Sequence, residues 1–415
     1  MRRPWLFGLA IAVVVAVIYL SGLLEVPESR TLDLRFDLRG PRAPSFPIAL
    51  VTVDDDSLAE MNLQWPWPRS LHAELLERIA AGKPLAIGVD ILFVEESRPA
   101  EDERLGEAVA RAGRVVLAAS LRSMATQTAV GVTQQREMFE PPIPTIRRGA
   151  AGIGFVELDR GQDAFVRAGA LSRRHAGQLH ASFTARLFAL AAPALHAEGS
   201  RAAQRQRVWV NFRGPSGTFP TYPYYQVVSG EIPPETFAGK IVLVGVDALS
   251  LHDRHPTPFS GASWLPTAEP GRTQGPDSGY ENLLMPGTEI QANLLDTLLR
   301  DDPIRRFPPA LSVLLILLVG TAAAAMAGHL RPLRAIAASV GLGIGYLGLT
   351  LVGFIWGNLW LEAVPVTLAL GVSAGGVISW NYMREERVRR EYARFFSPGV
   401  ARQIAEDRSG EALAG

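Results

Sequence analysis

The hydrophobic residues of this chain form two kinds of pattern. Four stretches, residues 5–24, 310–328, 335–356 and 359–380, are apolar and long enough to cross a bilayer as helices, which takes about 20 residues. Between residues 24 and 309, short apolar runs alternate with mixed segments instead. The pattern therefore predicts four transmembrane helices, one N-terminal and three C-terminal, with a separate domain between the first and the second.

The first half of this intervening domain alternates strand and helix signals. Short, continuously apolar runs at 48–53, 85–93 and 114–119 are typical of buried strands. Helical periodicity marks residues 70–81 and 102–112, with Ser70 as the expected cap of the first helix. Strands that are apolar throughout need cover on both faces. We therefore predict an α/β domain with a mainly parallel sheet flanked by helices.

The second half continues the same alternation. Residues 208–210 and 241–245 are predicted as further strands, with a loop at 213–225 between them. The polar run 250–282 is typical of a surface insertion, and residues 288–299 form an amphipathic helix.

The distribution of arginine predicts the orientation in the membrane. Arginines lie before the first span, between the second and third spans, and after the fourth: Arg2, Arg3, Arg331, Arg334, Arg384, Arg387, Arg389 and Arg390. These places share one side of a four-span topology, and the positive-inside rule assigns that side to the cytoplasm. The competing interpretation of the first span is a cleaved signal peptide, although no small-x-small cleavage site follows it. Either way the intervening domain is exported. The predicted domains are 1–24, 25–308, 309–381 and 382–415.

Composition narrows the class of protein further. With 41 basic and 41 acidic residues among 415, the net charge is zero, which argues against a nucleic-acid-binding protein. Cysteine is absent, which excludes disulfides, thiolate metal sites and cysteine nucleophiles. The mean hydropathy of +0.13 averages apolar spans with an ordinary polar domain.

Acidic residues follow several predicted strands. Asp54 and Asp55 follow the first, Asp90 lies within the second, and Asp247 follows the strand at 241–245. In open parallel sheets, ligands bind beyond the carboxyl ends of the strands, so these acids are candidate ligand-binding residues. The alternative is that they cap the helices and loops that follow.

The sequence Trp65-Pro66-Trp67-Pro68-Arg69 forms a rigid, bulky loop before a predicted helix. Trp and Arg favour binding surfaces, so Arg69 joins the candidate ligand-binding set, whereas the indoles could equally fix the loop to the core. His252, Asp253 and His255 lack a further nearby histidine, and we predict no metal site. No cofactor-binding motif or catalytic constellation is present; the run Gly214-Pro215-Ser216-Gly217 is not a nucleophile elbow.

Several runs together resemble the CHASE type 2 family of extracytoplasmic sensor domains from bacterial signalling receptors. They are Leu32-Asp33-Leu34-Arg35-Phe36, Arg39-Gly40-Pro41, Val53-Asp54-Asp55-Asp56-Ser57-Leu58, Trp65-Pro66-Trp67-Pro68-Arg69, Ile87-Gly88-Val89-Asp90-Ile91-Leu92-Phe93, Asn211-Phe212-Arg213-Gly214-Pro215, Gly239-Lys240-Ile241-Val242-Leu243-Val244-Gly245, Thr257-Pro258-Phe259, Pro286-Gly287-Thr288-Glu289 and Ala292-Asn293. The chain departs from the family at Ala164, where an Asp-Gly-Val-x-Arg run usually has glycine, and in its longer loop at 261–282. Both departures put local loop geometry in doubt.

The resemblance implies a receptor of the bacterial inner membrane, with one span, the sensor, three spans and a cytoplasmic output domain. The output in such receptors is commonly a class III nucleotide cyclase, a histidine kinase or a Ser/Thr kinase. Residues 383–394 are expected to continue the fourth span as a charged helix, and 395–400 resemble the junction before a cyclase domain. We expect that output domain to be missing from this chain, since only about twenty residues follow the junction, against well over a hundred in such a domain.

The sequence is compatible with several classes of function. The first is a receptor that senses an unknown extracytoplasmic ligand or protein, contacts membrane lipid and forms a homodimer through its spans and charged helix. Gly341 and Gly345, and Gly371 and Gly375, have the GxxxG spacing that permits close helix contact, either within the three-span bundle or between two copies. The alternatives are a tethered extracytoplasmic enzyme or a stand-alone membrane sensor or interaction protein, and the last is a transporter. The spans carry almost no charge, which argues against transport.

Overall fold

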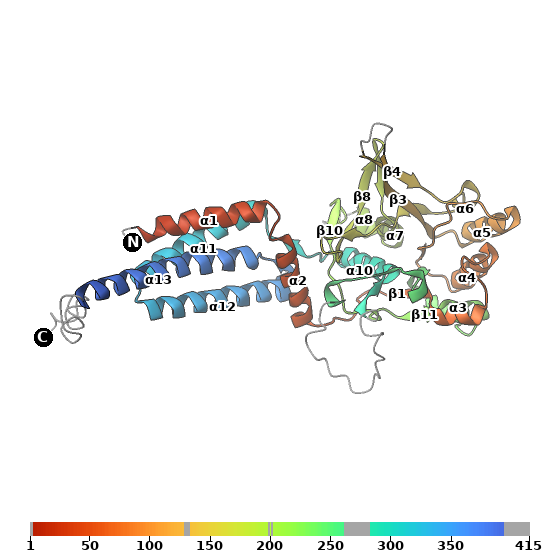
Figure 1. Ribbon diagram of the computed structural model, residues 1–415. Coiled ribbons are helices and arrows are strands. Elements are labelled where there is room, and N and C mark those ends of the chain that lie inside the picture. Colours follow the sequence, from red (N-terminus) through yellow and green to blue (C-terminus); the bar gives the residue numbers. More distant parts are fainter. Residues whose placement is uncertain (1–2, 128–132, 198–199, 201, 261–282, 394–415) are drawn as a thin grey trace. The chain divides into compact units, whose positions relative to one another are not determined.

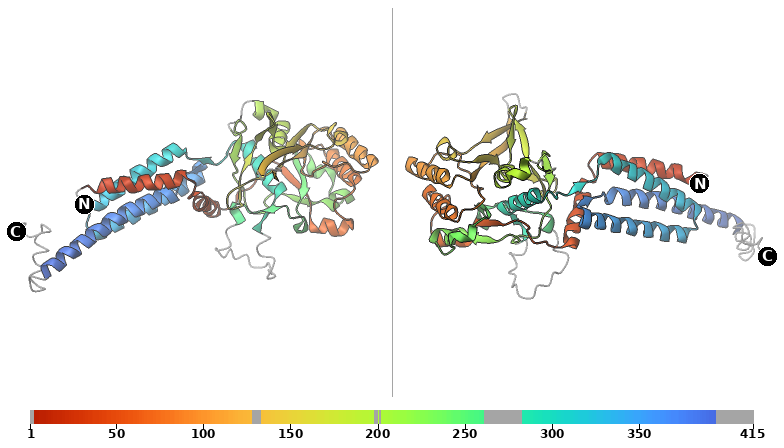
Figure 2. Two further views of the ribbon diagram at one scale, coloured as in Figure 1. Left: turned by 45° about the horizontal axis from the view of Figure 1, so that its top comes forward. Right: turned by 180° about the vertical axis from the view of Figure 1, so that it is seen from behind.

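The computed structural model describes residues 3–127, 133–197, 200, 202–260 and 283–393 (Figures 1 and 2). The chain divides into two compact units. One comprises residues 32–305 and is called the α/β unit below. The other comprises residues 1–31 and 306–415 and is called the helical unit.

The α/β unit contains a seven-stranded sheet with the order β11-β1-β12-β2-β3-β4, in which β5 also pairs with β3. Its strands are β1 (Ile48–Val53), β2 (Ala86–Val89), β3 (Val115–Gln127), β4 (Thr133–Glu140), β5 (Gly152–Phe155), β11 (Thr221–Pro223) and β12 (Ile241–Val246). All neighbours are parallel except β3 and β4. The sheet is therefore mixed, although the part formed by the predicted strands is parallel.

Four strands differ from the sequence prediction. β2 ends at Val89, before the predicted end at residue 93, so Asp90 follows this strand instead of lying within it. β3 continues to Gln127 and pairs with β4 from Ser120 onward. The predicted strand at 208–210 is β10 (Arg207–Trp209), which lies in a separate sheet with β7 (Val166–Ala170) and β6 (Asp159–Arg160). The expected loop at 213–225 contains β11, an edge strand of three residues ending in proline. So short a strand has no periodicity to detect, and an edge tolerates proline.

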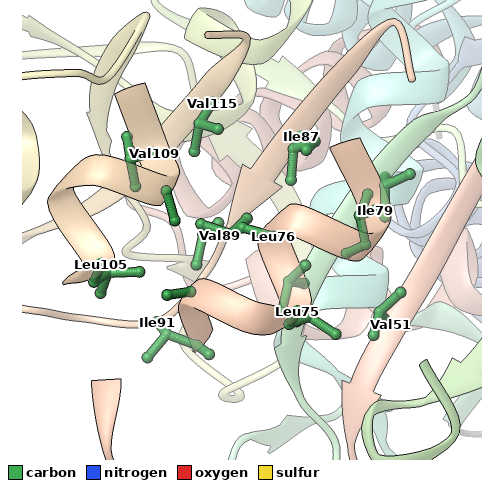
Figure 3. Close-up of a cluster of buried hydrophobic side chains, with 14 of the residues drawn as sticks. Val51, Leu75, Leu76, Ile79, Ile87, Val89, Ile91, Leu105, Val109 and Val115 are labelled. Carbon is green, nitrogen blue, oxygen red and sulfur yellow. The ribbon is translucent and has the colours of Figure 1, made fainter. Parts of the chain in front are cut away.

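Helices cover both faces of the sheet (Figure 1). They are α3 (Asp55–Met61), α4 (Arg69–Ala81), α5 (Pro99–Ala112), α6 (Pro144–Arg147), α7 (Phe183–Ala191), α8 (Pro193–Ala197), α9 (Tyr224–Ser229) and α10 (Gly287–Arg300). Figure 3 shows the core formed by α4, α5 and the strands beneath them. On the opposite face α7 and α10 contact β1, β2, β3, β5 and β12. Both faces are thus covered, as continuously apolar strands require.

Two glycines permit the close approach of α7 and α10 to the sheet. A Cβ atom at Gly88 in β2 would lie 2.6 Å from the ring of Phe183 in α7. A Cβ at Gly245 in β12 would overlap the side chain of Thr288 in α10. Both glycines belong to the runs on which the family resemblance rests, and their role is helix–sheet packing.

The predicted cap of α4 is wrong. The helix begins at Arg69, and Pro68 occupies the capping position without a side-chain hydrogen bond. Ser70 lies inside the helix, where its backbone N–H donates to Glu101 of α5 over 2.6 Å. A carboxylate from a neighbouring helix therefore meets the free amide that a local cap would otherwise satisfy. Helix α3 was not predicted at all.

The remaining described elements are short. They are β8 (Ser172–His175), β9 (Gln178–Ala181), β13 (Arg254–His255), β14 (Met285–Pro286), β15 (Arg305–Arg306), and the 3₁₀ turns Pro234–Phe237, Leu249–Leu251 and Pro258–Ser260. The rest of the predicted insertion, residues 261–282, lies outside the described residues, as does the predicted junction at 395–400.

The helical unit consists of α1 (Pro4–Leu20), the start of α2 (Glu25–Arg39), α11 (Pro309–His329), α12 (Pro332–Gly357), the bridge strand β16 (Leu359–Trp360) and α13 (Val364–Ala393). Among the described helices, α11, α12 and the Val364–Val388 part of α13 are long and apolar enough to cross a membrane. These three confirm the C-terminal spans. The predicted N-terminal span is divided: α1 has 17 residues, and α1 and α2 meet the criterion only as a pair bent by 83°.

The last span begins later than predicted, at Val364, and it continues without a break to Ala393, as expected for a charged extension. Pro365 occupies the first turn of α13, where the missing N–H costs no hydrogen bond, so this proline does not interrupt the helix. In the extension, Glu386 and Arg390 form the expected i,i+4 pair at 3.1 Å.

Small residues pack α1 against α11, but they are not the predicted ones. A Cβ at Gly320 of α11 would lie 2.8 Å from the Cβ of Ala12 in α1. At Gly341, Gly345, Gly371 and Gly375, a Cβ would have no described atom within 4 Å. Within the described bundle, these four positions are therefore not where the helices approach most closely.

Candidate functional site

The carboxyl ends of the parallel strands bring four acidic residues to one edge of the sheet. Asp54 follows β1, Asp247 follows β12, Asp90 follows β2, and Glu157 comes two residues after β5. Because the strands run in the same direction, these positions meet at one edge. The structure divides them into two groups with different surroundings.

The first group has structural partners. Asp54 caps α3 by accepting a hydrogen bond from the Ser57 amide over 2.8 Å. Asp55 accepts hydrogen bonds from the Leu249 amide and the Ser250 hydroxyl at 3.2 and 3.3 Å. These contacts agree with the capping alternative.

Asp247 belongs to the same group. It forms an ion pair with Arg254 at 2.6 Å. Burial raises the pKa of Asp247 to about 6, against the opposing effect of the Arg254 guanidinium. None of Asp54, Asp55 and Asp247 lines either of the two cavities described next.

Asp90 has a different environment. Its side chain has no hydrogen-bond partner among the described residues, and it lines two adjoining cavities that also share Leu92 and Asp253. Burial raises the pKa of Asp90 well above its ordinary value, and the carboxylates of Asp253 and Glu157 raise it further. A strand-end acid that caps nothing is a stronger candidate for ligand binding than the others.

The larger cavity has a volume of about 930 Å³ and is called the aromatic cavity, since Trp65, Trp67, His72 and Phe93 contribute to its lining. Trp65 and Trp67 lie edge to face with centroids 5.4 Å apart. Trp67 is buried against Tyr224, and its indole N–H donates to the Leu63 carbonyl over 3.2 Å. Trp67 thus fixes the loop to the core, whereas Trp65 keeps partial exposure at the cavity.

Arg69 lines the aromatic cavity, but its charge is already paired. The guanidinium donates to the buried carboxylate of Asp102 in α5 and to the carbonyl of Glu95. It therefore holds the loop after β2 between α4 and α5. His72 lies on the next turn of α4 and is neutral, because burial and the Arg69 charge lower the pKa of His72 to about 4.

The smaller cavity, about 480 Å³, is called the acidic cavity and is lined by Asp90, Glu157, Asp253 and neighbouring polar residues. One carboxylate oxygen of Glu157 accepts hydrogen bonds from the Ser120 hydroxyl at 3.0 Å and the Leu121 amide at 2.5 Å. The other oxygen is buried and has no hydrogen-bond partner in the described structure. The acidic cavity thus contains an unsatisfied buried acceptor.

The acid Asp253 and the histidine His255 complete the wall of the acidic cavity. Asp253 contacts the His255 ring at 3.2 Å, and His255 contacts the Arg160 guanidinium at 3.3 Å on its other nitrogen. Within the described residues, no three His, Asp or Glu side chains are placed to share a metal ion.

Sequence reasoning did not select Glu157 or Asp253. Glu157 follows a strand in the same way as Asp90, but the four-residue strand β5 was not predicted, so no predicted strand end pointed to Glu157. Asp253 comes from an irregular loop, and no local pattern places it beside β2.

A family model described as the CHASE2 domain matches residues 10–326, more than half of the chain. The chain belongs to the CHASE2 domain family. CHASE2 domains are extracellular sensor domains, so the α/β unit is a sensor. No curated protein and no solved structure matches the chain.

Many residues in the CHASE2 runs stabilise the fold of the α/β unit. The buried Arg213 guanidinium pairs with Asp296 of α10 and, at 3.0 Å, with Asp302. The side chain of Asn293 accepts from the Arg213 amide over 2.9 Å. The buried Glu289 carboxylate accepts from the amides of the turn at 217–218 over 2.9–3.0 Å. These residues hold the Asn-Phe-Arg-Gly-Pro segment to α10.

The departure from the CHASE2 pattern at Ala164 has a visible consequence. Ala164 has a φ of +65°, in the left-handed region that favours glycine. The ion pairs at the end of this turn form nonetheless. Arg167, at its end, is buried and forms hydrogen bonds of 2.6–2.8 Å with both carboxylates of Asp33 and Asp163.

A buried polar cluster lies in the helical unit of this CHASE2 protein. Glu28 of α2 accepts hydrogen bonds from the Trp360 indole at 2.9 Å and from the first backbone amides of α13, at Ala363 and Val364. Arg306 pairs with Glu25 over 2.8 Å and with Glu362 over 2.9 Å. We call this the Glu28–Arg306 cluster. The cluster joins α2, the segment before α11, and the start of α13.

Proposed function

We propose that this chain is the sensing and transmitting part of a receptor, and that its α/β unit receives the stimulus in the adjoining acidic and aromatic cavities. The observation that carries this proposal is the environment of Asp90. This residue lies in a CHASE2 run at the carboxyl edge of the sheet, and it faces both cavities without a hydrogen-bond partner among the described residues. The other strand-end acids at this edge that the sequence selected have structural partners.

The Glu28–Arg306 cluster supports the transmitting role. The chain passes from one unit to the other between residues 31 and 32 and again between 305 and 306. Glu28 lies just before the first of these points, and Arg306 lies directly after the second. Both side chains bind the segment at the start of α13. A displacement of either connection therefore changes the contacts of α13, which continues as one helix to Ala393.

In this proposal α1 and the start of α2 form a fourth, N-terminal span in the inner membrane of a bacterium. The arginines that flank the spans hold both termini in the cytoplasm, and the α/β unit lies outside it. Two copies associate through their spans and the charged extension of α13. Gly341, Gly345, Gly371 and Gly375 are available for this contact because they face no described residue within the bundle. The output is a class III nucleotide cyclase.

The experiment is a fusion of the cytoplasmic end to a class III cyclase catalytic domain, expressed in bacteria that lack their own cyclase. Cyclic AMP is measured for the parent fusion, for Asp90→Asn and for the control Asp56→Asn, which changes an exposed acid of α3. We expect Asp90→Asn to change the output and the control to leave it unchanged. An output that stays the same after Asp90→Asn, and also after deletion of residues 32–305, would show that the α/β unit is not the sensor.

A further inference from the structure

The joined cavities carry information about the chemistry of their ligand, given the proposed sensing function. Together they offer a polar end around Asp90, Glu157 and Asp253, and an end where Trp65 and Phe93 line the wall beside charged residues such as Arg98 and Glu101. Their volumes of about 480 and 930 Å³ match small-molecule sites, which span roughly 300–1,000 Å³.

The polar end is short of hydrogen-bond donors and of positive charge. Asp90 and the second oxygen of Glu157 have no hydrogen-bond partners among the described residues, and that Glu157 oxygen is buried. The acidic cavity has one arginine in its lining, Arg160, whose guanidinium contacts the His255 ring. Buried acceptors are satisfied in nearly all proteins, so the buried Glu157 oxygen calls for a ligand that donates hydrogen bonds, and the partly exposed Asp90 carboxylate can accept from the same ligand.

The spacing of the carboxylates argues for an organic cation over a metal ion. No three acidic or histidine side chains in the described structure converge on one point, as a metal site requires. Asp90 nevertheless interacts electrostatically with both Asp253 and Glu157, so a cation among them is attracted by all three. An ammonium group suits this arrangement, since it carries three donors that can reach separate acceptors.

The aromatic cavity specifies the rest of the ligand. Trp65 is partly exposed at its wall, and the buried Phe93 also lines this cavity, with its ring 5.5 Å from that of His72. Indole and phenyl faces accommodate alkyl chains and attract cations. His72 adds no charge here, because its pKa lies at about 4.

We propose that the joined cavities bind an alkyl polyamine, with one ammonium group donating to Asp90 and Glu157 and the alkyl chain along Trp65. This inference rests on the proposed function, because it names the ligand class of the same site.

The test is calorimetric titration of the full chain in lipid nanodiscs with spermidine. The comparison ligands are 1,4-butanediol, which lacks charge, succinate, which has the opposite charge, and calcium chloride. We expect spermidine alone to bind. Asp90→Asn and Glu157→Gln should each weaken its affinity at least about tenfold, as loss of a charged hydrogen-bond partner does, while Asp56→Asn should leave it unchanged. Thermal unfolding of each variant without ligand checks that it folds; Glu157→Gln retains an acceptor for Ser120.

Several results would overturn the polyamine assignment: no heat from spermidine at millimolar concentration, equal binding of butanediol, tighter binding of calcium, or unchanged affinity in both folded variants. The cyclase fusion separates this failure from failure of the proposed function. If Asp90→Asn alters cyclic AMP while spermidine does not bind, the site is sensory but its ligand is not a polyamine. If spermidine binds while the output ignores every change in residues 32–305, the proposed sensing function is wrong.

Discussion

Replacing Ala164 with glycine should stabilise the α/β unit. Ala164 is exposed and has a φ of +65°, so its methyl group contributes no core packing and adopts a conformation that L-residues disfavour. The left-handed conformation costs an L-residue about 1–2 kcal/mol, and glycine avoids this cost. Glycine also gains roughly 0.4–1 kcal/mol of conformational entropy in the unfolded chain, which offsets part of the gain.

The net stabilisation is therefore about 0.5–1 kcal/mol. For domains of about 150–250 residues, 1 kcal/mol shifts Tm by roughly 2–4 °C. Since the α/β unit spans residues 32–305, a slightly longer chain, we expect Ala164→Gly to raise its Tm by about 1–3 °C. Tryptophan fluorescence follows the transition, because Trp65 and Trp67 lie in the core of this unit or at its edge.

The matched control is Gly177→Ala, since Gly177 has a φ of +79° and open space where a Cβ would lie. This substitution imposes the cost that the first one removes, so its Tm should fall by a similar amount. A Tm for Ala164→Gly at or below that of the parent, alongside a clear fall for Gly177→Ala, would refute the reasoning about strain at Ala164.

Three further predictions follow from the two units. Asp90 has a raised pKa in the folded state, so it stabilises the fold below about pH 4 and loses this effect as pH rises through the folded pKa. In ligand-free buffer, the Tm of Asp90→Asn should therefore exceed that of the parent by an amount that grows from pH 4 to pH 8. A difference in Tm that stays constant with pH would contradict this. Asp296→Asn should destabilise the α/β unit by about 3 kcal/mol, because it weakens a fully buried ion pair. Glu103→Gln breaks an exposed ion pair and should cost under about 1 kcal/mol. Equal losses of unfolding free energy for the two variants in denaturant would argue against this difference. Gly320→Leu should separate α1 from α11 and lower the thermal stability of the detergent-solubilised chain, while Gly341→Leu should leave the monomer's stability unchanged. Equal thermal stability of the two variants would contradict this.

The CHASE2 runs divide by role. Gly88 and Gly245 admit helices close to the sheet, and Arg213, Glu289 and their partners fix a loop to α10. These roles concern stability. Asp90 has no such role in the described structure, and its raised pKa shows that its ionised form is disfavoured. A residue that costs stability in the empty protein is more readily explained by ligand binding than by folding.

Local pattern was sufficient for the long elements. β1, α10 and the three C-terminal spans could be predicted because each depends on a run of apolar residues that is long compared with its period. The sequence also selected Asp90, although it placed this residue within a strand predicted at 85–93, whereas β2 ends at Val89. The short strand β11 and the helix α3 carry too few residues for a pattern, so they were missed.

What the sequence by itself determined was therefore the division into apolar spans and an α/β domain, the parallel part of the sheet, and the edge where acidic residues gather. Only the tertiary structure decided which of those acids are free. Asp54 and Asp247 were equivalent to Asp90 in the sequence, but Ser57 and Arg254 bind the first two, whereas Asp90 meets two further carboxylates across a cavity. The physical reason is that the carboxylates opposite Asp90 come from distant parts of the chain, whereas Asp54 and Asp247 are bound by residues three and seven positions further on, whose contacts depend on how the backbone turns. The local sequence records the acid but not what the fold places opposite it.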